Sequence, residues 1–292
     1  MNAASQTSAA TQVPIAAAPP VPVLRITPPT RWWVVPVAEL WQARELIYFF
    51  VWRDIKIRYK QTAVGAAWAV LQPLLAMTVF TLFFGKLAHI PSEGLPYQVF
   101  VLAGLLPWMY FAASLANATN TIVENQRVIT KVYFPRLVLP LSAVLSGLVD
   151  FGISFVIFAI MMVYYHLRPT MQILWLPAFL LLAMLTALGV GLWLSALNAI
   201  YRDVRYVLPF LIQLWLFASP VIYPPSLMSA KWRWLFGLNP MAGVIEGFRW
   251  SLAGQGDPPI HLILVSTGIV LALLLSGLAY FQKMETTIAD VA

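Results

Sequence analysis

The chain of 292 residues contains no cysteine, and only 10% of its residues carry a charged side chain. The missing thiols exclude a disulfide framework, a cysteine nucleophile and a thiolate metal site. Soluble proteins carry roughly 25% charged residues, whereas 61% of the residues are hydrophobic here. The composition therefore excludes a soluble domain and predicts a membrane protein.

Motifs for catalysis and for nucleotide binding are missing as well. The three histidines are isolated, and no His-x-x-x-His or paired-carboxylate pattern offers a metal or acid–base site. No Gly-x-x-x-x-Gly-Lys-[Ser/Thr] segment occurs, so nothing in the sequence is typical of a loop that holds ATP phosphates. We expect no metal or cofactor on this chain, and no catalytic site. The histidines are His89, His166 and His261.

What the chain does have is a series of long apolar runs. A helix needs about 20 apolar residues to cross ~30 Å of hydrocarbon, and six runs approach or exceed that length, one of them broken only by Asp150. A β-barrel is excluded because its strands would alternate apolar and polar residues. The predicted fold class is an all-α membrane protein with six transmembrane helices. The spans are expected at 64–86, 97–121, 137–164, 172–199, 206–223 and 260–281.

Basic residues are distributed unevenly among the connections between these runs. If the N-terminus is cytoplasmic, 13 of the 18 Lys and Arg residues lie on the cytoplasmic side, which the positive-inside rule favours. This predicts a multi-pass protein with both termini in the cytoplasm. Membrane lipid rather than nucleic acid explains the net charge of +7. Residues 1–36 are interpreted as a disordered cytoplasmic tail, and 286–292 as a cytoplasmic C-terminal tail.

Two segments outside the spans have their own patterns. Residues 37–61 mix apolar and basic side chains at helical spacing, which predicts an amphipathic helix in the membrane interface, either a basic anchor or a platform for a cytoplasmic partner. Residues 224–259 include a short apolar segment that cannot span, which predicts re-entrant or gate helices on the external side or a loop on the outer leaflet. The candidate gate residues are Trp232, Trp234, Asn239, Pro240, Glu246 and Arg249.

Asp150 is the polar exception inside a predicted span. A charged side chain at the centre of a membrane helix costs about 2.5–3.5 kcal/mol on insertion scales, so Asp150 is expected to be buried against protein or to face water. Ser142, Ser146 and Ser154 continue its stripe at four-residue steps. A structural hydrogen bond between helices is favoured over a proton relay, because no second carboxylate or histidine lies at similar depth.

Short motifs occur in a fixed order within residues 37–285. They are Trp52-Arg-Asp-Ile-Lys-Ile-Arg-Tyr-Lys60, Gly65-Ala-Ala-Trp68, Gly104-Leu-Leu-Pro-Trp108, Phe134-Pro-Arg-Leu-Val-Leu-Pro140, Tyr201-Arg-Asp-Val204, Ser219-Pro-Val-Ile-Tyr223 and Asn239-Pro-Met241. Together they resemble the transmembrane permease subunits of bacterial ABC exporters for polysaccharides and polyol phosphates, which move O-antigen, teichoic acid and some capsular chains. Each motif alone is weak, and their order carries the resemblance.

The resemblance implies a homodimer in the bacterial inner membrane, clamped by two copies of a separate ATPase subunit that holds ATP and Mg²⁺. It also implies export of a lipid-linked polysaccharide such as O-antigen. The ATPase contacts that it implies are Arg53, Asp54, Lys56, Arg58, Glu124, Arg127, Lys131 and Arg136. The candidate channel residues, whose rings could lie against sugars, are Trp68, Phe80, Phe84, Trp215, Phe217 and Tyr223.

Two other kinds of function stay open from the sequence. A related ABC exporter permease for teichoic acid, a capsular polymer, a drug or a lipid would have the same architecture. An intramembrane glycosyl or acyl transferase would need polar catalytic groups that converge near one interface, and the acidic residues offer no such group. Copurification of an ATPase, together with the nature of a trapped substrate, would discriminate among these functions.

Overall fold

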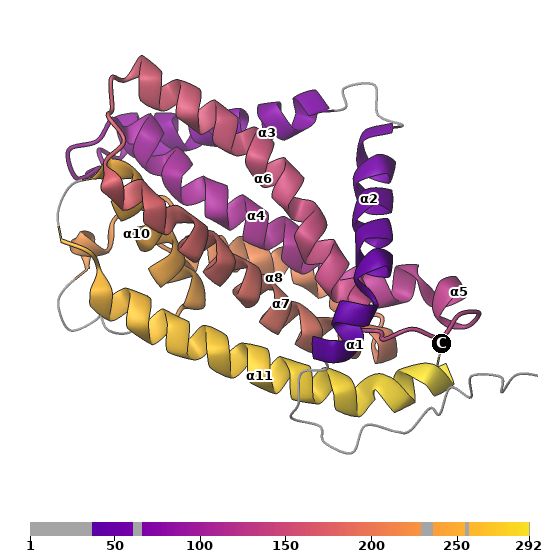
Figure 1. The fold of residues 1–292 in the computed structure, drawn as a ribbon. Coiled ribbons are helices and arrows are strands. Elements are labelled where there is room, and N and C mark those ends of the chain that lie inside the picture. The colour runs from indigo at the N-terminus through magenta and orange to yellow at the C-terminus, as the bar shows by residue number, and fades with distance from the viewer. Residues whose placement is uncertain (1–36, 61–65, 229–235, 255–256, 292) are drawn as a thin grey trace, which may run out of the picture. The chain divides into compact units, whose positions relative to one another are not determined.

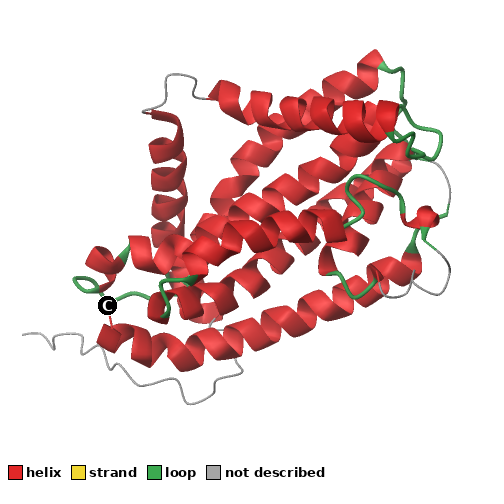
Figure 2. Ribbon diagram, turned by 180° about the vertical axis from the view of Figure 1, so that it is seen from behind, coloured by secondary structure: helices red, strands yellow, loops and turns green. Residues whose placement is uncertain are grey.

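The computed structural model describes residues 37–60, 66–228, 236–254 and 257–291. Every regular element in these ranges is a helix (Figures 1 and 2), which confirms the predicted all-α class. The predicted tail 1–36 and the candidate gate residues Trp232 and Trp234 lie outside the described residues. The longer helices are α2 (Arg44–Lys60), α3 (Ala66–Phe80), α4 (Tyr97–Glu124), α6 (Val138–Tyr164), α7 (Leu176–Ile200), α8 (Val204–Ala218), α10 (Pro240–Ala253) and α11 (Ile260–Val291). The shorter ones are α1 (Val37–Gln42), η1 (Thr81–Leu87), α5 (Gln126–Ile129), η2 (Met171–Trp175) and η3 (Pro225–Leu227).

Five of the helical segments are long and apolar enough to cross a membrane. They match five of the predicted spans, with ends that differ by a few residues. The last of these helices, α11, continues to Val291 through part of the predicted C-terminal tail. The protein is therefore a multi-pass membrane protein. The five segments are Ala67–Leu87, Tyr97–Glu124, Val138–Tyr164, Met171–Ile200 and Ile260–Glu285.

The sixth predicted span corresponds to a shorter helix. With 15 residues, α8 rises about 22 Å, which is less than the ~30 Å of a hydrocarbon core. The helix ends at Ala218 because Ser219, which precedes Pro220, takes an extended backbone with φ −105° and ψ 149°, as residues before proline do. A sixth crossing, completed by the chain that follows α8, stays a prediction.

The long helices pack in the order α11, α7, α4, α6, each against the next (Figure 1). At the junction of α7 and α11, a Cβ added to Gly277 would lie 2.4 Å from the carbonyl oxygen of Gly189. Glycine at this point lets the two backbones approach closely. Trp193 of α7 stacks on Tyr280 of α11, with ring centroids 4.3 Å apart. α4 is the most buried of the five candidate spans, so it forms the centre of the core.

The segment predicted as one interfacial helix forms two helices, α1 and α2, with a turn at Ala43. In Figure 1, α2 crosses the direction of the long helices, and it packs on α6. Phe50 is 2% exposed, and its ring lies 5.7 Å from that of Phe134. The aromatic side chains Tyr48 and Trp52 are exposed. An interfacial position of α2 in the membrane stays a prediction.

The helix α10 has clear local signals at both ends. The side chain of Asn239 accepts a hydrogen bond from the backbone N–H of Met241 at 3.0 Å, and Pro240 occupies the first helical position. Gly254 ends the helix in the left-handed conformation, with φ 63°. At 14 residues α10 is too short to span, and it packs against α4, α7 and α11. Its predicted role as a re-entrant or gate helix stays a prediction.

Candidate functional site

The C-terminal end of α2 reaches a carboxylate in the middle of α6. Arg58 donates a hydrogen bond to Oδ2 of Asp150, and the hydroxyl of Tyr59 donates one to Oδ1. The side chains of Arg58 and Asp150 are 31% and 29% exposed. The guanidinium and the phenol thus stabilise a charge that would otherwise be costly inside a span. We call Arg58, Tyr59 and Asp150 the Asp150 clasp.

The protonation of Tyr59 keeps the Asp150 clasp intact at neutral pH. Partial burial, followed by the hydrogen bond to Asp150 and its negative charge, raises the pKa of Tyr59 to about 12, while Arg58 acts in the opposite direction. The phenol therefore remains a hydrogen-bond donor throughout the physiological range. One positive and one negative side chain leave the clasp with no net charge.

A cavity of about 810 Å³ lies beside the Asp150 clasp, and we call it the clasp cavity. Its walls come from the end of α2 and from α3, α4, α6 and α8. The three clasp residues and Gln72 of α3 supply hydrogen-bonding groups to it. Besides Tyr59 of the clasp, the aromatic residues that line it are Trp68, Phe80, Trp108, Tyr110 and Phe151. Aromatic faces and a compact set of polar groups therefore border the same space.

The aromatic wall of the clasp cavity is held in place by its neighbours. The hydroxyl of Tyr110 donates to the carbonyl oxygen of Val144 at 3.0 Å, and the Tyr110 ring meets Phe151 edge-on with centroids 5.9 Å apart. A Cβ added to Gly147 would lie 2.7 Å from Oγ of Ser114 and 3.2 Å from the Tyr110 ring. Glycine here lets α4 and α6 approach closely enough to fix that ring.

Three of the predicted channel residues lie on α3 and η1. Trp68 and Phe80 line the clasp cavity, and the Trp68 side chain is 56% exposed. Phe84 meets Phe80 edge-on, with ring centroids 5.9 Å apart. The structure thus brings Trp68 and Phe80 to one cavity, with Phe84 next to Phe80. That these rings face a pore stays a prediction.

The other three predicted channel residues lie on α8 and just after it. The Trp215 ring meets Phe111 edge-on at 5.0 Å, and its Nε1–H donates to Oδ1 of Asn239 at 2.9 Å. The hydroxyl of Tyr223 donates to the carbonyl oxygen of Phe217 at 2.8 Å, and the Phe217 side chain is about half exposed. Trp215 therefore ties α8 to the N-terminal cap of α10.

A buried arginine fixes α10 to two other parts of the chain. Arg249 donates to Glu246 at 2.6 Å and, through Nε, to the carbonyl oxygen of Phe100 at 3.3 Å. Its Nη2 donates to the carbonyl oxygen of Val221, and its guanidinium lies 3.7 Å from the centroid of the Phe100 ring. We call this arrangement the Arg249 anchor. It joins α10, α4 and the segment after α8, so two of the candidate gate residues, Glu246 and Arg249, hold that segment in place.

The gap that Arg249 occupies depends on Gly104 of α4. A Cβ at Gly104 would lie 2.8 Å from Nη2 of Arg249 and 3.0 Å from the carbonyl oxygen of Val221. Distances this short force the neighbours to move. The Gly104-Leu-Leu-Pro-Trp108 and Ser219-Pro-Val-Ile-Tyr223 motifs therefore meet in space through Arg249.

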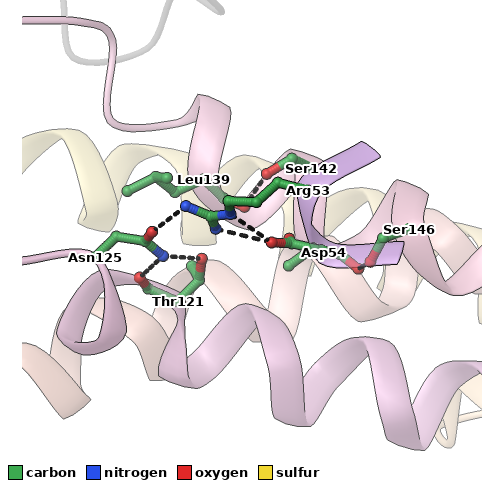
Figure 3. A network of polar contacts seen from close by, with 8 residues as sticks. Arg53, Asp54, Thr121, Asn125, Leu139, Ser142 and Ser146 are labelled. Carbon is green, nitrogen blue, oxygen red and sulfur yellow. Dashed lines mark hydrogen bonds and ion pairs between the residues drawn. The ribbon is translucent and has the colours of Figure 1, made fainter. Parts of the chain in front are cut away.

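A second polar cluster joins α2 to the C-terminal end of α4 (Figure 3). Arg53 donates to Oδ1 of Asn125 at 2.7 Å and pairs with Asp54 at 2.8 Å, while Asn125 donates to the carbonyl oxygen of Thr121 at 2.8 Å. These residues and Glu124 border a cavity of about 460 Å³. Four of the predicted ATPase contacts thus lie together at this cavity: Arg53, Asp54, Arg58 and Glu124.

The remaining predicted ATPase contacts fall into two groups. Lys56, Arg127 and Lys131 are exposed, the last two on and just after α5. Arg136 donates to the carbonyl oxygen of Glu285 at 2.6 Å, which ties the connection between α4 and α6 to α11. Arg58, as described above, also pairs with Asp150. The contact with an ATPase stays a prediction for all of these residues.

Several residues of the clasp cavity were not foreseen. Tyr59, Gln72, Trp108 and Tyr110 lie on three different helices, and no sequence spacing links them. One signal was available, since a carboxylate inside a span calls for a cation partner. Many basic residues could be the cation partner of Asp150. Only the fold shows that the partner is Arg58, 92 positions earlier in the chain.

Five candidate spans, a core built around α4 and a partly polar cavity define a multi-pass helical membrane protein. Its sequence matches the family described as ABC-2 type transporter over residues 45–253. Because the match covers more than half of the chain, the protein belongs to the ABC-2 type transporter family. Permeases of this family work with a nucleotide-binding ATPase subunit, so the prediction of a transport subunit rather than an enzyme is confirmed.

Curated relatives match over most of their length. The O-antigen export system permease protein RfbA of Myxococcus xanthus is 30% identical over 257 residues, which cover 87% of this chain and 98% of that protein. A protein of the same description from Klebsiella pneumoniae is 28% identical, covering 85% of this chain and 95% of its own length. The polysialic acid transport protein KpsM of Escherichia coli is 24% identical, covering 80% of this chain and 91% of its own length.

Proposed function

We propose that this chain is the permease subunit of an ATP-driven exporter that moves a lipid-linked polysaccharide such as O-antigen across the bacterial inner membrane. Two copies of the chain form the permease, both termini of each copy lie in the cytoplasm, and two ATPase subunits hold ATP and Mg²⁺ below it. The observation that carries this proposal is the similarity to O-antigen export permeases, which spans nearly the whole length of those proteins.

A capsular polymer is the second candidate substrate. The similarity to a polysialic acid transport protein supports it, at lower identity and over a smaller share of the chain. Both candidates are long glycans, so the same conduit chemistry applies to them. An intramembrane transferase has no support, because the family is one of transporters.

The exposed apolar surfaces of α3 and α8 leave room for a dimer with a conduit between protomers. On α8, the side chains of Phe210 and Leu214 are 61% and 51% exposed, and on α3 Leu75 is 50% exposed. Apolar side chains such as these need lipid or a second copy of the chain as a partner. In the proposed dimer, α3 and α8 line the conduit, and Trp68, Phe80 and Phe217 offer their rings to the sugars.

The test of this function measures both the polymer and its location. Cells without the chain should keep their lipid-linked polymer on the cytoplasmic side, and the chain supplied in trans should restore surface display. Purified chain should hydrolyse no ATP and should copurify with its ATPase. Normal surface glycan in cells without the chain, or nucleotide hydrolysis by the purified chain alone, would refute the proposal.

The contact with the ATPase is tested separately at Arg127 and Lys131. Both side chains are exposed, so Arg127→Glu with Lys131→Glu should leave folding intact while it removes ATPase copurification and export. Lys86→Glu, another exposed lysine that the proposed topology places on the external side, is the matched control. Unimpaired export by the double variant would show that these charges only meet lipid headgroups.

A further inference from the structure

We propose that the clasp cavity, whose wall lies within one protomer and includes α3, is a subsite on the conduit that binds hexopyranose units of the exported glycan. This inference rests on the proposed function and adds a defined binding site to it. The site consists of the Asp150 clasp, the amide of Gln72 and the aromatic wall that includes Trp68 and Trp108.

The polar groups of the cavity offer both donors and acceptors. Arg58 uses Nη1 on Asp150, and a guanidinium carries five N–H donors, so donors remain for a ligand. The Asp150 carboxylate receives one hydrogen bond on each oxygen and retains further lone pairs. Gln72 adds an amide that donates and accepts. A sugar hydroxyl is itself donor and acceptor, and this set therefore suits vicinal hydroxyl groups.

The aromatic lining suits the other face of the same ligand. One face of a pyranose presents C–H groups, and aromatic rings such as Trp68 and Trp108 offer flat apolar surface to it. Such contacts depend on the shape of the sugar ring and not on one particular glycosidic linkage. A subsite of this kind can hold successive units of a moving polymer without demanding one sequence of sugars.

Two other occupants fit the cavity less well. A phosphate group would meet the Asp150 carboxylate, which already offsets the charge of Arg58. An acyl chain would fill the apolar part but would displace water from the amide of Gln72 and the spare donors of Arg58 without offering hydrogen bonds in return, which costs free energy. The zero net charge and the mixed donors and acceptors therefore favour a neutral polyhydroxy ligand.

A ligand can reach this site in the described structure. Gln72 and Ala113 line the clasp cavity, and both are exposed. No hydrogen bond joins the Gln72 amide to another described residue. Removal of this amide therefore tests ligand binding without breaking a hydrogen bond inside the protein. Ala113 offers a place for a probe, and the absence of native cysteine makes a single introduced thiol unambiguous.

The experiment measures protection of one cysteine by a sugar. The full chain with Ala113→Cys is purified in detergent, and the rate of maleimide labelling is measured with and without maltoheptaose at ~10 mM, which nearly saturates a site with a dissociation constant on the order of 1 mM. We expect labelling to slow at least threefold. Ala88→Cys, in an exposed loop outside the cavity, is the matched control and should label at the same rate under both conditions.

A second variant identifies the groups that bind. Gln72→Leu keeps the side-chain volume and removes the amide, so the protection constant should weaken about tenfold, the effect of roughly one hydrogen bond. Gln213→Leu, on an exposed part of α8 outside the cavity, should leave it unchanged. Equal protection in both leucine variants would overturn the assignment of Gln72 and with it the polar half of the site.

The other outcomes also decide the question. Absence of protection by maltoheptaose overturns the subsite, and protection by added phospholipid alone shows that the cavity is a lipid pocket. Export by the Gln72→Leu variant is measured in cells in parallel. If the unmodified chain fails to restore surface glycan, the proposed function fails whatever the binding result. If it restores export but shows no protection, only the subsite is wrong.

Discussion

Two ion pairs with similar partners have very different surroundings. In the Arg249 anchor, the side chains of Arg249 and Glu246 are 5% and 11% exposed, and the guanidinium also meets two carbonyl oxygens and the Phe100 ring. In the Asp150 clasp, Arg58 and Asp150 are 31% and 29% exposed and border a cavity. The first pair is enclosed by protein, and the second is open to whatever fills that cavity.

The difference teaches what each pair can do. A buried charge that loses its partner has no water to replace it, so the anchor fixes α10, α4 and the segment after α8 as one unit. A partly exposed pair can exchange a protein partner for water or a ligand at small cost. The anchor therefore serves the scaffold, whereas the clasp is suited to bind and release.

The largest effect is expected when the buried pair is broken. Arg249→Met removes the guanidinium and leaves Glu246 buried without its cation, which costs about 3–5 kcal/mol. The Tm of the purified chain in detergent should fall by on the order of 10 °C. Arg168→Met, at an exposed arginine in a connecting segment, is the control and should change Tm little. An unchanged Tm in Arg249→Met would refute the anchor.

A smaller loss is expected at the glycine that makes room for the anchor. Gly104→Ala places a methyl group 2.8 Å from Nη2 of Arg249, and overpacking of this kind costs about 1–3 kcal/mol. Gly152→Ala is the matched control, since no atom lies within 4 Å of its added Cβ, and alanine there should stabilise α6 by up to about 1 kcal/mol. Effects of the same sign in both variants would contradict this account.

The spans could be predicted from sequence because hydrophobic run length alone determines whether a helix can cross a membrane. The helix α8 was predicted too long, since the apolar run continues past Ser219 and only the preference of a residue before proline for extended backbone ends the helix. The motifs that carry the family resemblance were found, but that Gly104 and Val221 meet around Arg249 depends on tertiary contacts far apart in sequence.

The candidate site was predicted less completely than the spans. Arg58 was assigned to an ATPase contact on the family resemblance, and that contact stays a prediction. The structure shows that Arg58 also pairs with Asp150, which lies 92 residues further along the chain. Charge and periodicity describe each helix alone, and they cannot show which face of α2 meets α6. The cavity that results is a property of several helices together.

The coupling free energy between Arg58 and Asp150 in the Asp150 clasp should be small. A double-mutant cycle with Arg58→Gln and Asp150→Asn is expected to give a coupling free energy of about 1 kcal/mol, near the upper limit for exposed pairs, because both side chains are partly shielded. Chemical unfolding in detergent measures the three variants against the unmodified chain. A coupling of 3 kcal/mol or more, as in a buried pair, would erase the contrast with the Arg249 anchor.

The smallest effect is expected at the phenol of the clasp. Tyr59→Phe removes one partly exposed hydrogen bond and should cost about 0.5 kcal/mol. Because the pKa of Tyr59 is raised to about 12, the folded chain keeps the proton where an unfolded tyrosine begins to lose it near pH 10. The stabilisation by the Tyr59 hydrogen bond is therefore fully present below about pH 10 and is lost as the pH rises toward 12.

The free energy of unfolding, measured from pH 7 to pH 11, should differ between the unmodified chain and Tyr59→Phe by a constant amount up to about pH 10. Above that pH the difference should shrink. A difference that shrinks already between pH 7 and pH 9 would mean that the phenol does not donate to Asp150 as described.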